Sequence, residues 1–131
     1  MASSVIYRRG NLDDLSRLSF AQGLSVTTES IEFNVVGMGH ELWLAVMGNS
    51  IVGVTVLGNT APNQRTVMYL QVADLYAGQG IGSAVLIAAI ENYPDSEFTV
   101  IPFEGTEEFY RRLGFEKSGQ RNKIETLMMM N

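Results

Sequence analysis

The chain has 131 residues, of which 46% are hydrophobic and 18% charged, so it has the length of one domain and enough apolar material for a core. Nine Lys and Arg residues against 14 Asp and Glu residues give a net charge of −5, which lacks the basic footprint of a general nucleic-acid-binding protein. The sequence has no cysteine and a single histidine, His40, which excludes a disulfide scaffold, a cysteine nucleophile and a multi-histidine metal centre.

The first 40 residues are expected to form a short strand followed by two helices. Residues 5–7 are β-prone, and Asn11 offers a side-chain oxygen that can cap the start of a helix. Apolar residues at helical spacing then predict an amphipathic helix over residues 12–22. Within residues 23–40, Thr28 is expected to cap a second helix that ends at two glycines.

The middle of the chain is expected to form a meander of three strands. Residues 41–47 and 50–57 are β-prone and flank a Gly48-Asn49 turn, which predicts a hairpin. Residues 58–65 are rich in turn formers and are expected to form a loop. Apolar and polar side chains alternate in the third strand, residues 67–73.

The second half adds helices between further strands. In chain order, the expected elements are an apolar helix at 80–92, a strand at 98–101, a helix at 106–113 and strands at 115–117 and 124–130. The resulting order, β-α-α-β-β-β-α-β-α-β-β, favours an α+β or mixed α/β domain with one sheet covered by helices. We expect residues 1–131 to form this single domain.

A glycine-rich turn lies between the third strand and the apolar helix. Residues 74–83 read Asp-Leu-Tyr-Ala-Gly-Gln-Gly-Ile-Gly-Ser. Unpaired N–H groups at the start of a helix attract anions, and glycine lets a ligand approach the backbone closely. The turn therefore favours a phosphate cradle that needs no basic side chain, although a tight turn that merely requires glycine is the alternative. It matches neither a Walker loop nor the dinucleotide fingerprint.

Two segments together resemble the GNAT superfamily of N-acetyltransferases. The strand and turn at residues 69–82 resemble the acetyl-CoA-binding motif Q/R-x-x-G-x-G/A, with Gly80 and Gly82 at its two small positions. Residues 109–115, Phe-Tyr-Arg-Arg-Leu-Gly-Phe, are similar to the family's F-Y-x-x-L-G-F segment, and both motifs occur in the family's order and spacing. Ala77 departs from the family's usual Arg or Gln, so we expect weaker cofactor binding.

The resemblance implies both a fold and a cofactor. The fold would be α/β, with a central, mostly antiparallel sheet, a splayed pair of parallel strands at residues 67–73 and 97–102, and about four flanking helices. Acetyl-CoA would be the co-substrate, with its pantetheine arm between the splayed strands and an amide near Val72 stabilising the developing oxyanion. The residues expected to bind it are Leu70, Val72, Gly78, Gln79, Gly80, Ile81, Gly82 and Ser83.

The resemblance also implies the reaction. The acetyl group of acetyl-CoA would pass directly to a primary amine, on a small molecule or a protein, without an acyl-enzyme. Tyr110 matches the family's general acid, and its alternative role is that of a core aromatic. The general base stays open between a water relay and Glu29, Glu32, His40, Glu41 and Asp74. Because Ala77 departs from the motif, a non-catalytic acyl-CoA-binding regulatory module is the alternative function.

The remaining expectations concern partners and location. The longest nearly apolar run, residues 84–90, is far shorter than the roughly 20 residues of a membrane span, and no export signal is evident. We therefore expect a cytoplasmic protein with an amine acceptor, without membrane or nucleic-acid partners. We expect no metal, although composition alone leaves open a carboxylate site for a hard cation. Residues 128–130, three methionines, are expected to end a strand or to contribute to a homodimer seam.

Overall fold

A computed structural model describes residues 4–11, 13–14, 39–76, 78–102, 105–121 and 124–130. Within these residues, seven strands form one sheet in the order β1-β2-β3-β4-β5-β7-β6. The strands are β1 Val5–Arg9, β2 Glu41–Met47, β3 Ser50–Ala61, β4 Gln64–Val72, β5 Glu97–Val100, β6 Glu116–Arg121 and β7 Ile124–Met130. Neighbouring strands are antiparallel except for β4 and β5, which confirms the expected mostly antiparallel sheet with one parallel pair.

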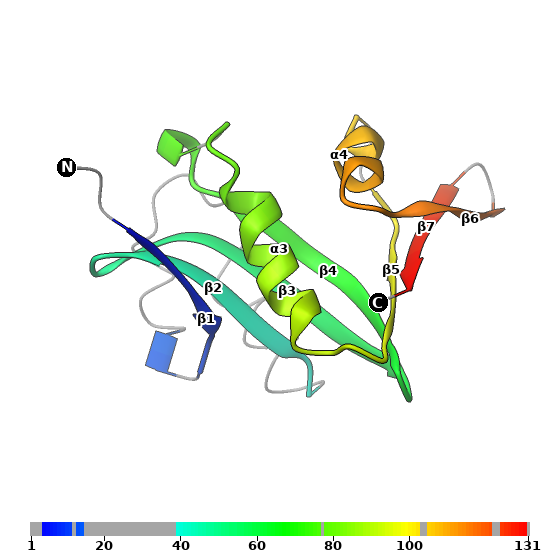
Figure 1. The fold of residues 1–131 in the computed structure, drawn as a ribbon, viewed down its shortest axis with the longest axis horizontal. Coiled ribbons are helices and arrows are strands. Elements are labelled where there is room, and N and C mark those ends of the chain that lie inside the picture. Colours follow the sequence, from blue (N-terminus) through cyan, green and yellow to red (C-terminus); the bar gives the residue numbers. More distant parts are fainter. Residues whose placement is uncertain are drawn as a thin grey trace.

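Two α-helices lie within the described part of the chain. They are α3 Ile81–Glu91 and α4 Glu107–Arg112, and a short 3-10 helix, η2 Asp74–Tyr76, precedes α3. Figure 1 shows α3 crossing one face of the sheet and α4 lying past the upper end of β5. Both helices confirm sequence predictions, whereas the expected count of about four is not confirmed. Most of the helix predicted over residues 12–22, and the helix predicted within residues 23–40, lie outside the described residues.

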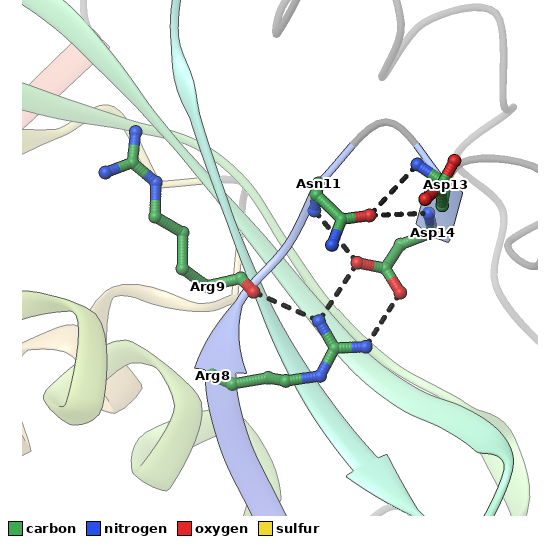
Figure 2. Close-up of polar contacts among 5 residues, drawn as sticks. All are labelled: Arg8, Arg9, Asn11, Asp13 and Asp14. Carbon is green, nitrogen blue, oxygen red and sulfur yellow. Dashed lines mark hydrogen bonds and ion pairs between the residues drawn. The ribbon is translucent and has the colours of Figure 1, made fainter.

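The start of the first predicted helix is described, and its cap is present. The Asn11 side-chain oxygen accepts hydrogen bonds from the N–H groups of Asp13 (3.0 Å) and Asp14 (3.3 Å). The Asp14 carboxylate in turn accepts the Asn11 N–H at 2.8 Å, which completes a capping box. The Arg8 guanidinium donates two hydrogen bonds, of 2.9 and 2.7 Å, to the same carboxylate (Figure 2). The hydrogen bond to Asp14 raises the pKa of Arg8. The cap thus ties this helix start to β1.

The loop predicted at residues 58–65 is wrong. Strand β3 continues to Ala61 and β4 begins at Gln64, so only a tight turn separates them. Asn63 takes the left-handed conformation in that turn, with φ of 59°. Residues 58–61 remain in β3, and the β3–β4 register shifts twice along the pair.

Apolar side chains bury both faces of the sheet around β2 and β3. The face under α3 carries the larger cluster, which includes Trp43, Val52, Leu57, Val67, Val85, Leu86, Phe98, Tyr110 and Phe115. The opposite face carries Leu42, Leu44, Val46, Ile51, Val54 and Val56. Burial on both faces makes this part of the sheet a firm support for β4.

A partly buried polar cluster fixes the beginning of β4. The Arg65 guanidinium lies 3.5 Å from a Glu41 carboxylate oxygen, hydrogen-bonds the Ser96 hydroxyl and stacks 3.7 Å from the centre of the Tyr93 ring. Burial, followed by its hydrogen bond to Glu41, raises the pKa of the Tyr93 phenol. Because Ser96 directly precedes β5, the cluster holds the starts of β4 and β5 together.

Candidate active site

The parallel strands β4 and β5 form a V. Residues 64–66 pair with residues 97–99, and no pairing continues beyond them in the described part of either strand. The Thr66 and Thr99 hydroxyls lie 2.9 Å apart at the last pair and close the joined end. Figure 1 shows the strands diverging from there toward the start of α3 and toward α4. This is the splayed pair that the sequence predicts.

The main chain of β4 presents alternate amides to the open V. The Ala73 N–H donates to the Val52 carbonyl at 2.8 Å, so it points to β3. Because backbone groups alternate in direction along an antiparallel strand, the Gln71 amide also points to β3. The amides of Leu70 and Val72 therefore point the other way, toward the gap that β5 leaves.

A cavity of about 280 Å³ fills the open end of the V. Its described lining residues are Leu70, Gln71, Val72, Gly82, Gly105, Thr106, Phe109 and Tyr110. It is thus built from β4, the first turn of α3 and the start of α4. Of the residues expected from the sequence, Leu70, Val72, Gly82 and Tyr110 are brought together around this one space.

The glycine turn leads into the cavity from the start of α3. Gly78 and Gly80 both have φ of 79°, and no described atom beyond their chain neighbours lies within 4 Å of a methyl group added at either. Gln79, between them, is exposed. The first bond of α3 runs from the Ala84 N–H to the Gly80 carbonyl (3.0 Å), so the amides of residues 81–83 have no partner within the helix. Positively polarised amides without a partner within the helix suit a phosphate group.

Gly82 has a different reason to be glycine. A methyl group added there would lie 3.3 Å from Val72 Cγ2 and 3.7 Å from Phe109 Cζ. Gly82 therefore lets α3 pack closely against β4 and α4 at the cavity wall. The preceding Ile81 has its side chain in the core, so it reaches the cavity side only through its main chain. Ala77, which departs from the motif, lies outside the described residues.

Tyr110 is both a core aromatic and a cavity residue. It is 8% exposed and packs edge to face against Phe109 and Phe115, with ring centres 5.1 and 5.6 Å away. Burial raises the pKa of its phenol to about 12. The group therefore keeps its proton at neutral pH and can donate a hydrogen bond into the cavity.

A second cavity, of about 100 Å³, lies deeper in the V. Its described lining residues are Val67, Met68, Tyr69, Leu70, Val100, Ile101, Thr106 and Tyr110. Leu70, Thr106 and Tyr110 also line the first cavity, so the two spaces meet at these three residues.

The family model for the acetyltransferase (GNAT) domain matches residues 19–130. The chain belongs to the GNAT acetyltransferase family. It is therefore an acyltransferase that uses acetyl-CoA. A search of curated protein sequences finds no match to the chain.

Solved structures show the same GNAT fold at low sequence identity. The PaiA N-acetyltransferase of Thermoplasma acidophilum, in complex with coenzyme A, is 15% identical, with 98% of this chain and 99% of that one covered and a TM-score of 0.79. The IAA acetyltransferase of Bacillus cereus is 23% identical, with 98% and 100% covered and a TM-score of 0.73. The Escherichia coli ribosomal-protein-S18-alanine N-acetyltransferase is 14% identical, with 96% and 92% covered and a TM-score of 0.76.

The described residues contain neither a candidate membrane-spanning helix nor a candidate metal-binding group. No helix among them is both long and apolar enough to cross a membrane. No three His, Asp or Glu side chains among them gather into a group that could hold a metal ion.

Two of the four carboxylates that are candidates for the general base of this GNAT protein, Glu41 and Asp74, lie within the described residues. Glu41 is held in its ion pair with Arg65 and is not among the described residues that line either cavity. Asp74 is the first residue of η2. Glu29 and Glu32 lie outside the described residues.

His40 is bound in a way that opposes a direct role as base. Its Nδ1 atom accepts the Asn59 N–H at 3.1 Å, and the Asn59 side chain donates to the Gly39 carbonyl at 3.0 Å. In the neutral ring the other nitrogen then carries the proton, so no free lone pair remains to accept one from an amine.

Sequence reasoning missed Thr106 and Met68. Thr106 precedes Tyr110 by four residues, so both share one face of α4, and this spacing could have indicated a second cavity residue. Met68 has no partner in β3, because Val56 pairs with Tyr69 and Leu57 pairs with Val67. This bulge depends on the neighbouring strand and leaves no local signal.

Proposed function

We propose that the chain transfers the acetyl group of acetyl-CoA directly to a primary amine. The observation that carries this proposal is the meeting of two cavities at Leu70, Thr106 and Tyr110. One space begins at the glycine turn and the other passes between β4 and β5. Two substrates could thus enter separately and meet beside one hydrogen-bond donor, as direct transfer requires.

The first cavity fits the cofactor. The amides of residues 81–83, with the α3 dipole behind them, would hold the pyrophosphate beside Gly78, Gln79 and Gly80. The outward-pointing amides of Leu70 and Val72 would pair with the pantetheine arm as an added strand does. This assignment needs no cationic side chain, which agrees with the acidic composition.

Bound acetyl-CoA would supply the activated acetyl thioester. A free amine would form the C–N bond as the C–S bond breaks, and the proton that the nitrogen loses would pass through solvent to the thiolate, which leaves as the free thiol of CoA. The amide of Val72 or Leu70 would donate to the carbonyl oxygen as negative charge develops on it. The Tyr110 hydroxyl would donate to the departing sulfur. With its pKa of about 12 against about 8.5 for a thiol, complete proton transfer is uphill by about 5 kcal/mol, so Tyr110 acts by hydrogen bonding.

The test is a transfer assay with the purified chain. Thiol release from acetyl-CoA would be followed with a panel of primary amines, and mass spectrometry would identify an acetylated amine. Calorimetry would measure acetyl-CoA binding separately. Cofactor binding without transfer to any amine would contradict the proposal and favour a binding module. The cytoplasmic location and the homodimer expected from the sequence stay predictions.

A further inference from the structure

The second cavity opens on the face of the sheet opposite α3. Tyr69 packs with the apolar cluster on that opposite face, whereas Leu70 and Val67 belong to the cluster under α3. Gly58 follows Leu57, which belongs to the cluster under α3, so a methyl group added at Gly58 would point to the opposite face. Such a methyl group would lie 3.1 Å from Met68 Cγ and Sδ, so Met68 lies on the same face as Tyr69. The second cavity is therefore lined from both faces of β4, and its Met68 and Tyr69 side lies on the face opposite the cluster under α3.

The rim of this second mouth is apolar. Met68 is 40% exposed on one strand of the V, and Ile101 is 59% exposed just after the other. They are two of the five large hydrophobic side chains that are exposed among the described residues. Single exposed apolar residues are common, but here two from separate strands flank one opening. None of the eight described residues that line the cavity is charged.

These observations indicate what the second substrate must bring. An apolar group that covers Met68 and Ile101 removes their surfaces from water, which favours binding in proportion to the area covered. Methionine also adapts its shape to a flat ring more easily than a branched side chain does. A polycationic amine would lose water at this rim, and the described lining offers no charged partner in return.

We propose that the acceptor is a primary amine on an apolar or aromatic body, of the arylalkylamine class. The inference rests on the proposed function. The amine would lie at Leu70 and Tyr110, where the two cavities meet, and the body would cover Met68 and Ile101. The net charge of −5 then attracts the ammonium form at long range only, and the local apolar rim selects among amines.

The test compares phenethylamine with spermidine, glucosamine and a short peptide that begins with alanine, all at saturating acetyl-CoA. We expect kcat/KM for phenethylamine to exceed the others by about tenfold or more, mainly through a lower KM, which is the usual size of discrimination in an apolar pocket. Met68→Gln and Ile101→Thr should each raise the KM for phenethylamine several-fold and leave acetyl-CoA affinity unchanged. Ile6→Thr is the matched control, since Ile6 is 61% exposed on β1 and lines neither cavity among the described residues.

The outcomes separate the two proposals. A preference for spermidine, glucosamine or the peptide overturns the acceptor class but leaves N-acetyl transfer intact. A preference for phenethylamine that neither Met68→Gln nor Ile101→Thr alters overturns the placement of its body at this rim. Cofactor binding without transfer to any of the four amines overturns the proposed function, and the acceptor class falls with it.

Discussion

Tyr110 packs in the core and also keeps a proton that it can donate into the cavity. Its ring fills the space between Phe109 and Phe115, which takes the phenol out of water and raises its pKa to about 12. The same burial makes it a weaker acid and a dependable donor, because it stays protonated throughout the neutral range. A residue of this kind can stabilise a departing sulfur by a hydrogen bond without giving up its proton.

The first prediction removes that hydrogen bond. Tyr110→Phe keeps the ring and its packing, so the fold and the acetyl-CoA affinity should remain. We expect kcat and kcat/KM to fall together by about 100-fold, the lower end for removing one hydrogen-bond donor to a charge that develops in the transition state. Steady-state kinetics, under conditions where chemistry limits the rate, measure this effect.

The control for this variant is Tyr93→Phe. Tyr93 is a partly buried tyrosine with a raised pKa that belongs to the Arg65 cluster and is not among the residues found lining either cavity. Its turnover per folded molecule should match that of the unaltered protein. Wild-type turnover in Tyr110→Phe would return Tyr110 to a packing role alone.

The second prediction follows from the raised pKa itself. In the unfolded chain Tyr110 ionises near pH 10, but in the folded protein it ionises only near 12. The stability that this difference contributes is fully present below pH 10 and is lost as pH rises toward 12, because the unfolded chain releases its proton first. From pH 9 to 11 the loss is about 1 kcal/mol.

Urea unfolding of the unaltered protein and of Tyr110→Phe at pH 9, 10 and 11 checks this effect. The free energy of unfolding of the unaltered protein should fall by that amount relative to that of Tyr110→Phe as pH rises. Parallel curves would mean that the Tyr110 phenol is hydrated in the folded state.

At the scale of elements, the glycine turn combines two separate requirements. Gly78 and Gly80 need a positive φ, and Gly82 needs space at the contact of α3 with β4 and α4. The sequence motif marks these positions alike. Because a β-branched residue at positive φ is strongly strained, Gly80→Val would test backbone strain before it tested access to a phosphate.

The third prediction uses this distinction. Gly82→Ala should fold, since Val72 needs to yield by only a few tenths of an ångström, but its methyl group enters the cavity wall. We expect a loss of acetyl-CoA affinity of about tenfold, or 1.4 kcal/mol, with little change in thermal stability. Gly80→Ala should instead lower thermal stability and change acetyl-CoA affinity little, because a left-handed residue other than glycine costs about 1 kcal/mol of folding stability. Calorimetry and thermal unfolding of both variants measure this contrast, and equal effects on both quantities would contradict it.

Local signals predicted most elements but not their assembly. The cap at Asn11, the glycines around α3 and the β-branched run before residue 58 act within a few residues of themselves, so the sequence carries them directly. The loop at 58–65 was misassigned because its turn formers occupy shifted positions in a strand pair, and a register depends on the partner strand. Met68 and Ile101 share a mouth only because β4 and β5 diverge, which no local pattern encodes.

At the scale of the molecule, the V divides the sheet into two parts. Strands β1–β4 with α3 form one part, and β5, β7 and β6 form the other. In the described residues, the two parts are linked at one end by the paired starts of β4 and β5 and by the Arg65 cluster. Residues 67–70 of β4 and Val100 of β5 line the second cavity, so a ligand that occupies it contacts both parts and should stabilise their arrangement.

The last prediction tests this arrangement one amide at a time. In the free protein the amides of Leu70 and Val72 point to the gap, whereas the Gln71 amide points to β3. Acetyl-CoA should therefore move the amides of Leu70 and Val72 from fast to slow exchange, whereas the Gln71 amide should exchange slowly without ligand as well. With ligand at 100 times its Kd, bound protein outnumbers free protein about 100-fold, which sets the scale of the slowing for amides that exchange only in the free form. Adenosine 3′,5′-bisphosphate, which lacks the pantetheine arm, should protect residues 81–83 alone. Residue-resolved NMR exchange measures the pattern, and fast exchange of the Leu70 and Val72 amides in the acetyl-CoA complex would mean that the arm does not pair with β4.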